Sequence, residues 1–139
     1  FEAAAFLRRS GADTAEVKKL FQNDLEDTIA KYSIIQNAHL YREHIAVAVS
    51  AKPVGRVIAA QAADELLNII GIDASFVLAP DGDTVNISAR SMGDVNVQVV
   101  LEALGGGGNA AAAGGQVTGK SIEDVARELM QAIDQYLEG

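Results

Sequence analysis

Apolar residues recur at two spacings along this chain, and the spacing changes near position 44. Upstream they fall three or four residues apart, as along one side of an α-helix. We predict a first helix over residues 1–9, ended by Gly11. Asp13 and Glu16 have the spacing of a capping box for a second helix, and Asp24 would begin a third. The apolar side of the second and third helices consists of Val17, Leu20, Phe21, Leu25, Ile29, Tyr32 and Ile35.

Beyond position 44 apolar residues alternate with small or polar ones, which is typical of strands with one buried face. Residues 45–49 fit such a strand, and residues 75–79 fit a second strand that is apolar throughout. A turn over residues 80–83 would join the second strand to a returning strand at 84–90, so we predict a β-hairpin. A short strand is also expected at residues 116–118.

Three further helices are predicted around these strands, each with its own apolar stripe. They cover residues 57–70, 95–104 and 122–137. Asp94 would cap the second of them, and Ser121 would cap the third through a capping box. The resulting order predicts an α/β (α+β) fold, a mixed β-sheet covered by helices.

The length of 139 residues suits one compact domain. We expect residues 1–40 to form a helical connector and residues 41–139 to form that domain. Because the chain opens at Phe1 without a methionine and within a helical pattern, we interpret it as a piece of a longer protein.

Charge and composition exclude several function classes. The chain carries 19 acidic and 11 basic residues, a net charge of −8, which disfavours binding of long nucleic acids. A small anion in a local basic pocket remains compatible. Cysteine is absent, which excludes disulfides and zinc–thiolate sites and fits a cytoplasmic location. No apolar run approaches the ~20 residues needed to span a bilayer, so we expect no membrane contact by these residues.

The predicted strand at 84–90 carries the first candidate site. Because strand side chains alternate, Ser88 and Arg90 would be neighbours on a polar face, and Ser91 follows at the strand end. A guanidinium beside hydroxyl groups suits a phosphate. An ordinary solvated strand face would show the same pattern, so both interpretations stay open.

The second candidate is the glycine run Gly105, Gly106, Gly107 and Gly108, followed by Asn109. One glycine would end a helix, so four favour a loop whose backbone N–H groups approach a ligand. A flexible linker is the alternative. Asn109 would either hydrogen-bond a ligand or adopt a left-handed turn conformation.

Other patterns carry less weight. Residues 114–121 match the phosphate-loop spacing, but no apolar strand precedes them, and Ser121 is better explained as a helix cap. His39 and His44 are five residues apart and do not share a helical face, so we expect no metal site there.

These motifs, in this order, resemble the DHHA1 domain of the DHH-superfamily phosphoesterases, and most closely the GdpP-type cyclic-di-AMP phosphodiesterases. The matching segments are residues 6–13, 59–64, 87–91, 95–97 and 104–108. The resemblance covers nearly the whole chain. It implies that residues 1–40 follow a DHH domain, and it leaves open a homodimer and an upstream membrane anchor.

The resemblance also implies a division of labour. Mn²⁺ ions and the attacking water would lie in the preceding DHH domain, with no cofactor and no catalytic residue in this fragment. This domain would bind a cyclic dinucleotide or short phosphorylated nucleotide through Ser88, Arg90, Ser91 and the four glycines, with Asn96 as a weaker candidate. The family usually has histidine where this chain has Asn109. That departure supports an alternative, a degenerate nucleotide sensor without catalytic activity.

Overall fold

The computed structural model describes residues 14–139 and divides the chain into two compact units, residues 1–30 and 31–139. The predicted helix over residues 1–9, its end at Gly11 and the cap at Asp13 lie outside the described residues. Among the described residues, no helix is both long enough and apolar enough to span a membrane.

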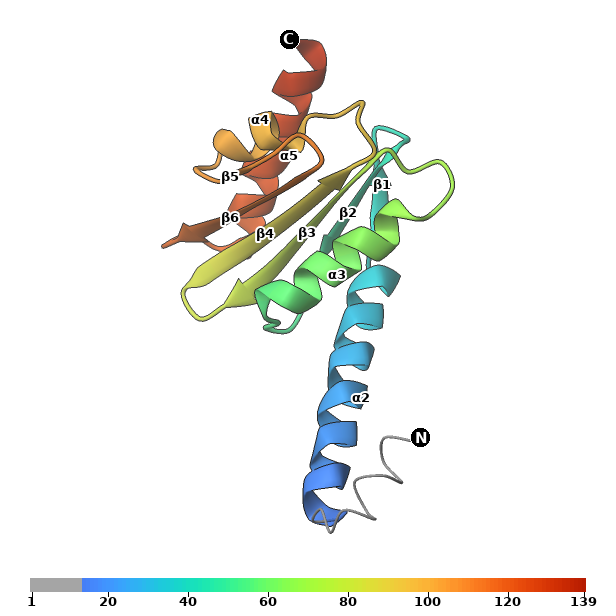
Figure 1. The fold of residues 1–139 in the computed structure, drawn as a ribbon. Coiled ribbons are helices and arrows are strands. Elements are labelled where there is room, and N and C mark those ends of the chain that lie inside the picture. The colour runs from blue at the N-terminus through green and yellow to red at the C-terminus, as the bar shows by residue number, and fades with distance from the viewer. Residues whose placement is uncertain (1–13) are drawn as a thin grey trace. The chain divides into compact units, whose positions relative to one another are not determined.

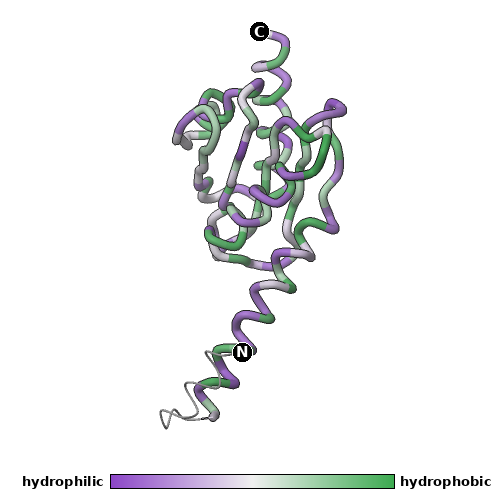
Figure 2. Tube along the Cα trace, turned by 45° about the vertical axis from the view of Figure 1, so that its right-hand side comes forward, coloured by the Kyte–Doolittle hydropathy of each residue, from purple (hydrophilic) through white to green (hydrophobic). Residues whose placement is uncertain are grey.

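Helix α2 (Thr14–Gln36) runs without a break where two helices were predicted. Asp24 lies inside it, and its carbonyl oxygen accepts a hydrogen bond from the Thr28 hydroxyl at 2.8 Å. No Gly or Pro interrupts this stretch, so the helix continues past Asp24. Figure 2 shows hydrophobic and hydrophilic residues alternating along the helix. Four of its apolar side chains are more than half exposed, namely Leu20, Phe21, Leu25 and Ile29.

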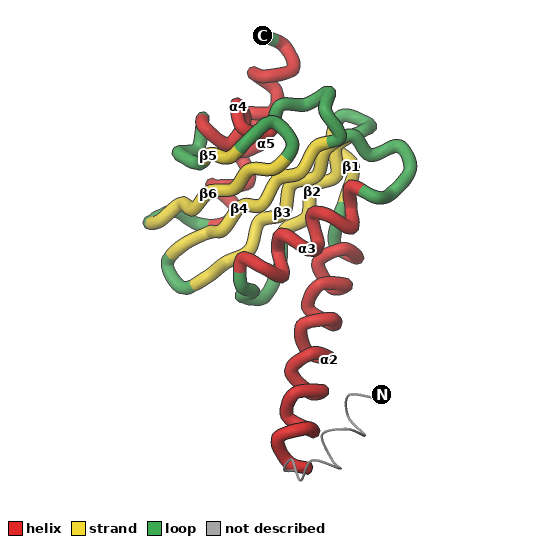
Figure 3. The backbone as a smooth tube through the Cα atoms, viewed as in Figure 1, coloured by secondary structure: helices red, strands yellow, loops and turns green. Residues whose placement is uncertain are grey.

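The second unit is built on a six-stranded mixed sheet with the order β1-β2-β3-β4-β6-β5 (Figure 3). Strands β2 and β3 are parallel, and the other neighbours are antiparallel. The predicted mixed sheet is therefore confirmed. The strands are β1 (His39–Tyr41), β2 (Ile45–Val49), β3 (Ala74–Asp81), β4 (Thr84–Ser91), β5 (Gly107–Gly108) and β6 (Ala112–Thr118).

The predicted hairpin is β3–β4, and its turn is tighter than expected. Pro80 and Asp81 belong to β3, so the connection is reduced to Gly82 and Asp83. Gly82, the first residue of this two-residue turn, has a φ of 66°. Glycine is favoured at that position because it adopts a left-handed conformation without steric cost.

Helices cover both faces of the sheet (Figure 1). One face packs against α3 (Arg56–Leu67) and the end of α2, and the other against α4 (Val97–Glu102) and α5 (Ile122–Glu138). Strand β3, between them, is therefore buried on both sides, with six consecutive buried residues from Ala74 to Ala79.

The helix ends differ from prediction in two places. Helix α3 ends at Leu67 rather than at residue 70, and the following Ile69 is half exposed. Helix α4 is capped by Asn96 rather than Asp94, because the Asn96 side-chain oxygen accepts from the backbone N–H of Gln98 and Val99. The predicted cap of α5 is confirmed, since Ser121 Oγ accepts from the backbone of Asp124 at 3.1 Å.

Candidate functional site

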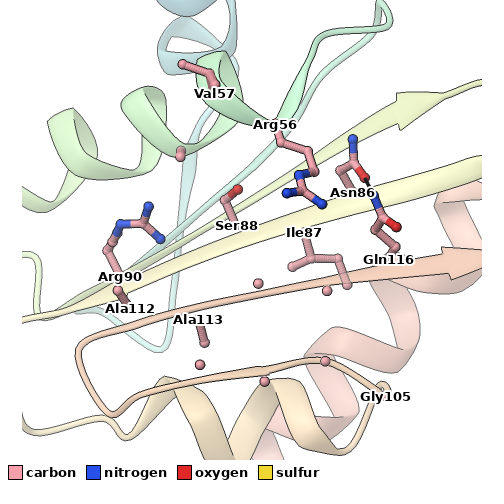
Figure 4. A pocket seen from close by; sticks show the side chains of 16 residues that line it. Arg56, Val57, Asn86, Ile87, Ser88, Arg90, Gly105, Ala112, Ala113 and Gln116 are labelled. Atoms are coloured by element: carbon pink, nitrogen blue, oxygen red, sulfur yellow. Dashed lines mark hydrogen bonds between the residues drawn. The ribbon is translucent and has the colours of Figure 1, made fainter.

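A groove of about 830 Å³ opens on the side of the sheet that α3 partly covers (Figure 4). Four segments line it: the first turns of α3, the polar face of β4, the glycine run, and β6. We call this cavity the groove. Its lining residues are Arg56, Val57, Ala60, Asn86, Ile87, Ser88, Arg90, Gly105–Gly108 and Ala112–Gln116.

Strand pairing determines which side chains reach the groove. Two polar residues of β4 lie opposite small residues of β6: Ser88 pairs with Gly114, and Arg90 with Ala112. Paired residues point to the same face of a sheet. Because glycine and alanine occupy the β6 positions opposite Ser88 and Arg90, no large side chain fills the groove beside Ser88, and a ligand has room there.

Arg90 is held in place from two sides. Its Nε donates to Asp64 Oδ1 on α3 at 2.8 Å, and its Nη1 donates to the carbonyl oxygen of Ala89 at 2.8 Å. A guanidinium has five N–H donors, so three remain without a partner among the described residues. The arrangement presents a positioned cation to the groove.

Ser88 completes this part of the groove. Its side chain lies between Arg56 and Arg90 (Figure 4), and its hydroxyl has no hydrogen-bond partner among the described residues. The hydroxyl can therefore donate to an anion held by Arg90. The sequence-based pairing of Ser88 with Arg90 is reproduced in the structure.

The glycine run forms the rim of the groove and packs very closely on β6. A Cβ on Gly106 would lie 2.5 Å from the carbonyl oxygen of Gly114, and one on Gly108 would lie 2.5 Å from that of Ala112. Neither position has room for a side chain. Gly107 differs, because a Cβ there would meet no atom within 4 Å. Backbone packing thus explains two of the four glycines without a ligand.

Three predicted site residues do not line the groove. Ser91 lies on the opposite face of β4, where its Oγ accepts from the backbone N–H of Gly93 at 3.0 Å. Asn96 caps α4. Asn109 Oδ1 accepts from the backbone N–H groups of Ala111 and Ala112, both at 2.9 Å, in the turn between β5 and β6. Each of these three side chains has a local structural role.

Sequence reasoning missed Arg56 and Gln116 as lining residues. Arg56 is the first residue of α3, and it makes no ion pair with any described carboxylate. Its position directly after Gly55, at the start of a helix, was the available signal. Gln116 lies opposite Asn86 because β6 pairs with β4, and the sequence pattern does not predict this long-range pairing.

The remaining sequence motifs have local structural surroundings. Residues 114–118 of the phosphate-loop pattern lie inside β6, and Lys120 Nζ binds the carboxylate of Glu128 at 2.8 Å. His44 Nδ1 lies 3.1 Å from the carbonyl oxygen of Gly71. Over residues 14–139, no three His, Cys, Asp or Glu side chains group as metal ligands.

Sequence comparison identifies the domain. The DHHA1 domain family matches residues 42–139. The chain belongs to this family. Over its whole length it is 42% identical to the cyclic-di-AMP phosphodiesterase GdpP of Bacillus subtilis and 40% identical to the cyclic-di-AMP phosphodiesterase PdeA of Listeria monocytogenes. The chain spans 22% of the length of each of these relatives.

Solved structures confirm the fold class of this DHHA1 domain. An exopolyphosphatase-related protein from Bacteroides fragilis has a TM-score of 0.70 at 19% identity, covering 96% of this chain and 42% of its own. The pGpG-specific phosphodiesterase PggH of Vibrio cholerae has a TM-score of 0.53 at 18% identity, covering 96% and 50%. At these identities the likeness concerns the fold alone.

Proposed function

We propose that this chain is the ligand-binding part of a DHH-type phosphodiesterase that hydrolyses a cyclic dinucleotide such as cyclic di-AMP. Residues 41–139 would be the DHHA1 domain, and residues 1–40 the connector from the DHH domain. The observation that carries the proposal is the meeting of Arg90, Ser88 and the glycine run in one groove. The relatives that are 40–42% identical are cyclic-di-AMP phosphodiesterases, which supports this substrate class.

In this proposal the chain binds and orients the ligand. Arg90 receives a phosphate oxygen on its unpaired N–H groups, Ser88 donates a hydrogen bond to the same phosphate, and the bare backbone of the glycine run lines the opposite side. The N–H groups of Gly105 and Gly106 already donate to the carbonyl oxygens of Glu102 and Leu101, at 3.1 and 2.8 Å, so these two glycines contribute space rather than donors. Mn²⁺ in the DHH domain would supply the activated water. The domain would work in the cytoplasm, with any membrane anchor elsewhere in the longer protein.

Titration calorimetry of the chain with cyclic di-AMP tests the proposal. We expect Arg90→Ala to weaken binding by about 2 kcal/mol, or roughly thirtyfold in Kd, because a charge-assisted hydrogen bond is lost. Arg127→Ala is the matched control, since Arg127 pairs with Asp124 on α5 and does not line the groove. Equal affinities for the parent chain and Arg90→Ala would contradict the proposal.

A degenerate sensor remains the second candidate, and Asn109 is the residue that favours it. An amide cannot carry the proton or positive charge that the family's usual histidine can. Restoring Asn109→His in the longer protein separates the two candidates. Hydrolysis that is fast in the parent and unchanged by this substitution excludes the sensor, whereas activity that appears only in Asn109→His supports it.

The same site also fits a second kind of substrate, a short single-stranded oligonucleotide. The net charge of −8 disfavours long strands, so any such substrate would be short. Competition between cyclic di-AMP and oligonucleotides of increasing length would rank these ligands.

A further inference from the structure

Three polar side chains form a hydrogen-bonded chain at the end of the groove remote from Arg90. Asn86 Nδ2 donates to Asp81 Oδ2 at 3.4 Å, and Gln116 Nε2 donates to Asn86 Oδ1 at 3.1 Å (Figure 4 shows the second bond). Asn86 is 1% exposed, whereas Gln116 is exposed on the neighbouring strand. The series of hydrogen bonds therefore runs from the Asp81 carboxylate to the accessible Gln116 amide.

These two hydrogen bonds fix the orientation of the Gln116 amide. An ionised carboxylate only accepts hydrogen bonds, so Asn86 must turn its NH₂ group to Asp81. The Asn86 oxygen then faces Gln116 and can only accept from it. As a result Gln116 keeps its Oε1 and one N–H of Nε2 without a partner among the described residues, an acceptor beside a donor in a defined order.

Arg56 lies over the same end of the groove (Figure 4). It has no carboxylate partner among the described residues, so its guanidinium is available to a ligand. Guanidinium planes stack on nucleic acid bases, and amide side chains pair with base edges. Arg56, which can stack on the face of a base, and Gln116, which can hydrogen-bond to its edge, thus lie at the same end of the groove.

We propose that Gln116 and Arg56 form an adenine subsite at this end of the groove, an inference that rests on the proposed nucleotide-binding function. Gln116 Oε1 accepts from the adenine N6 amino group, and Nε2 donates to N7. Arg56 stacks on the ring. Asn86 and Asp81 are positioning residues that hold the amide in this orientation. Guanine presents two acceptors, O6 and N7, so its O6 would meet Oε1 and be disfavoured.

The N7 contact makes the inference testable with one changed atom in the ligand. Binding of cyclic di-AMP to the chain is compared with binding of its 7-deazaadenine analogue, which lacks the N7 acceptor. We expect the parent chain to prefer cyclic di-AMP about tenfold. Gln116→Glu keeps an acceptor for N6 but has no donor for N7, so we expect this preference to disappear.

Asp81→Ala tests the positioning role. Without the carboxylate, Asn86 is free to rotate its amide by about 180° and no longer orients Gln116. The preference for cyclic di-AMP over the 7-deaza analogue should therefore fall by about threefold, while the affinity for the 7-deaza analogue stays unchanged. Thr118→Ala is the control, because Thr118 is on the same strand and the same face as Gln116 but does not line the groove. It should retain the parent preference.

The possible failures are distinguishable. Equal affinity of the parent chain for both ligands, or the parent preference in Gln116→Glu, would overturn the adenine subsite. If binding nevertheless depends on Arg90, the proposed phosphate-binding function stands. If no cyclic dinucleotide binds the parent chain, both proposals fall. Thermal melting of every variant checks that the fold is retained.

Discussion

Arg90 on β4 and Asp64 on α3 are joined by a 2.8 Å ion pair that anchors a groove-lining cation to a helix. Asp64 is 58% exposed at its side chain, so the pair contributes little to stability. Its consequence is geometric, since this bond and the one from Nη1 to the Ala89 carbonyl oxygen hold the guanidinium at the groove with three N–H donors unpaired among the described residues.

We therefore expect Asp64→Ala to weaken binding of cyclic di-AMP several-fold, because Arg90 loses the acceptor that orients it. Asp64→Asn keeps an oxygen acceptor and should bind within about twofold of the parent. Calorimetry of both variants decides this. Unchanged binding by Asp64→Ala would show that Arg90 is positioned by other contacts.

The glycine run provides a second prediction, on stability. Gly106→Ala should lower the free energy of unfolding by about 2 kcal/mol or more, because the added methyl group would overlap the Gly114 backbone. Gly107→Ala is the matched control and should change it by less than about 0.5 kcal/mol, since the site is open. Urea denaturation measures both. Similar losses in the two variants would argue against close packing of β6.

Asn96 offers a test of a residue that sequence reasoning placed in the site. As the cap of α4, Asn96→Ala should lower stability by about 1 kcal/mol, whereas Asn96→Asp keeps the capping oxygen and should not. Neither variant should alter the affinity for cyclic di-AMP. Weaker binding by Asn96→Ala without loss of stability would return Asn96 to the site.

Tyr41 links strand β1 to helix α5. Its hydroxyl donates to Asp134 Oδ1 at 2.6 Å, and this hydrogen bond, together with burial, raises the pKa of Tyr41 above its usual value of about 10. The stabilisation is present below pH ~10 and is lost as the pH rises through the raised pKa.

Tyr41→Phe should therefore be less stable than the parent by about 1 kcal/mol near neutral pH. The difference should shrink as the pH rises above the usual tyrosine pKa of about 10 and through the raised pKa of Tyr41, because the parent tyrosine then ionises beside Asp134. Urea denaturation at a series of pH values measures this difference. A gap that stays constant into strongly alkaline solution would mean that the hydrogen bond to Asp134 is not its source.

Local sequence determined the regular parts of the second unit. The alternation over residues 45–49 and 84–90 predicted β2 and β4, the apolar run over residues 75–79 predicted β3, and Ser121 predicted the start of α5. These signals are reliable because burial of one face imposes a period on neighbouring residues. The polar face of β4, with Ser88 beside Arg90, followed from the same period.

Tertiary structure determined the features that depend on contacts between distant segments, which the spacing of apolar residues does not predict. Gly107 and Gly108 form β5 because β6 lies against them, and glycines have no apolar period that would predict a strand. The exchange of Asp94 for Asn96 as the cap of α4 likewise depends on which side chain reaches the free N–H groups. The groove itself arises from long-range contacts, since only the pairing of β4 with β6 and the packing of α3 bring Arg56, Arg90 and Gln116 together. Spacing along the chain reports local burial, whereas a binding site depends on which distant segments share a face.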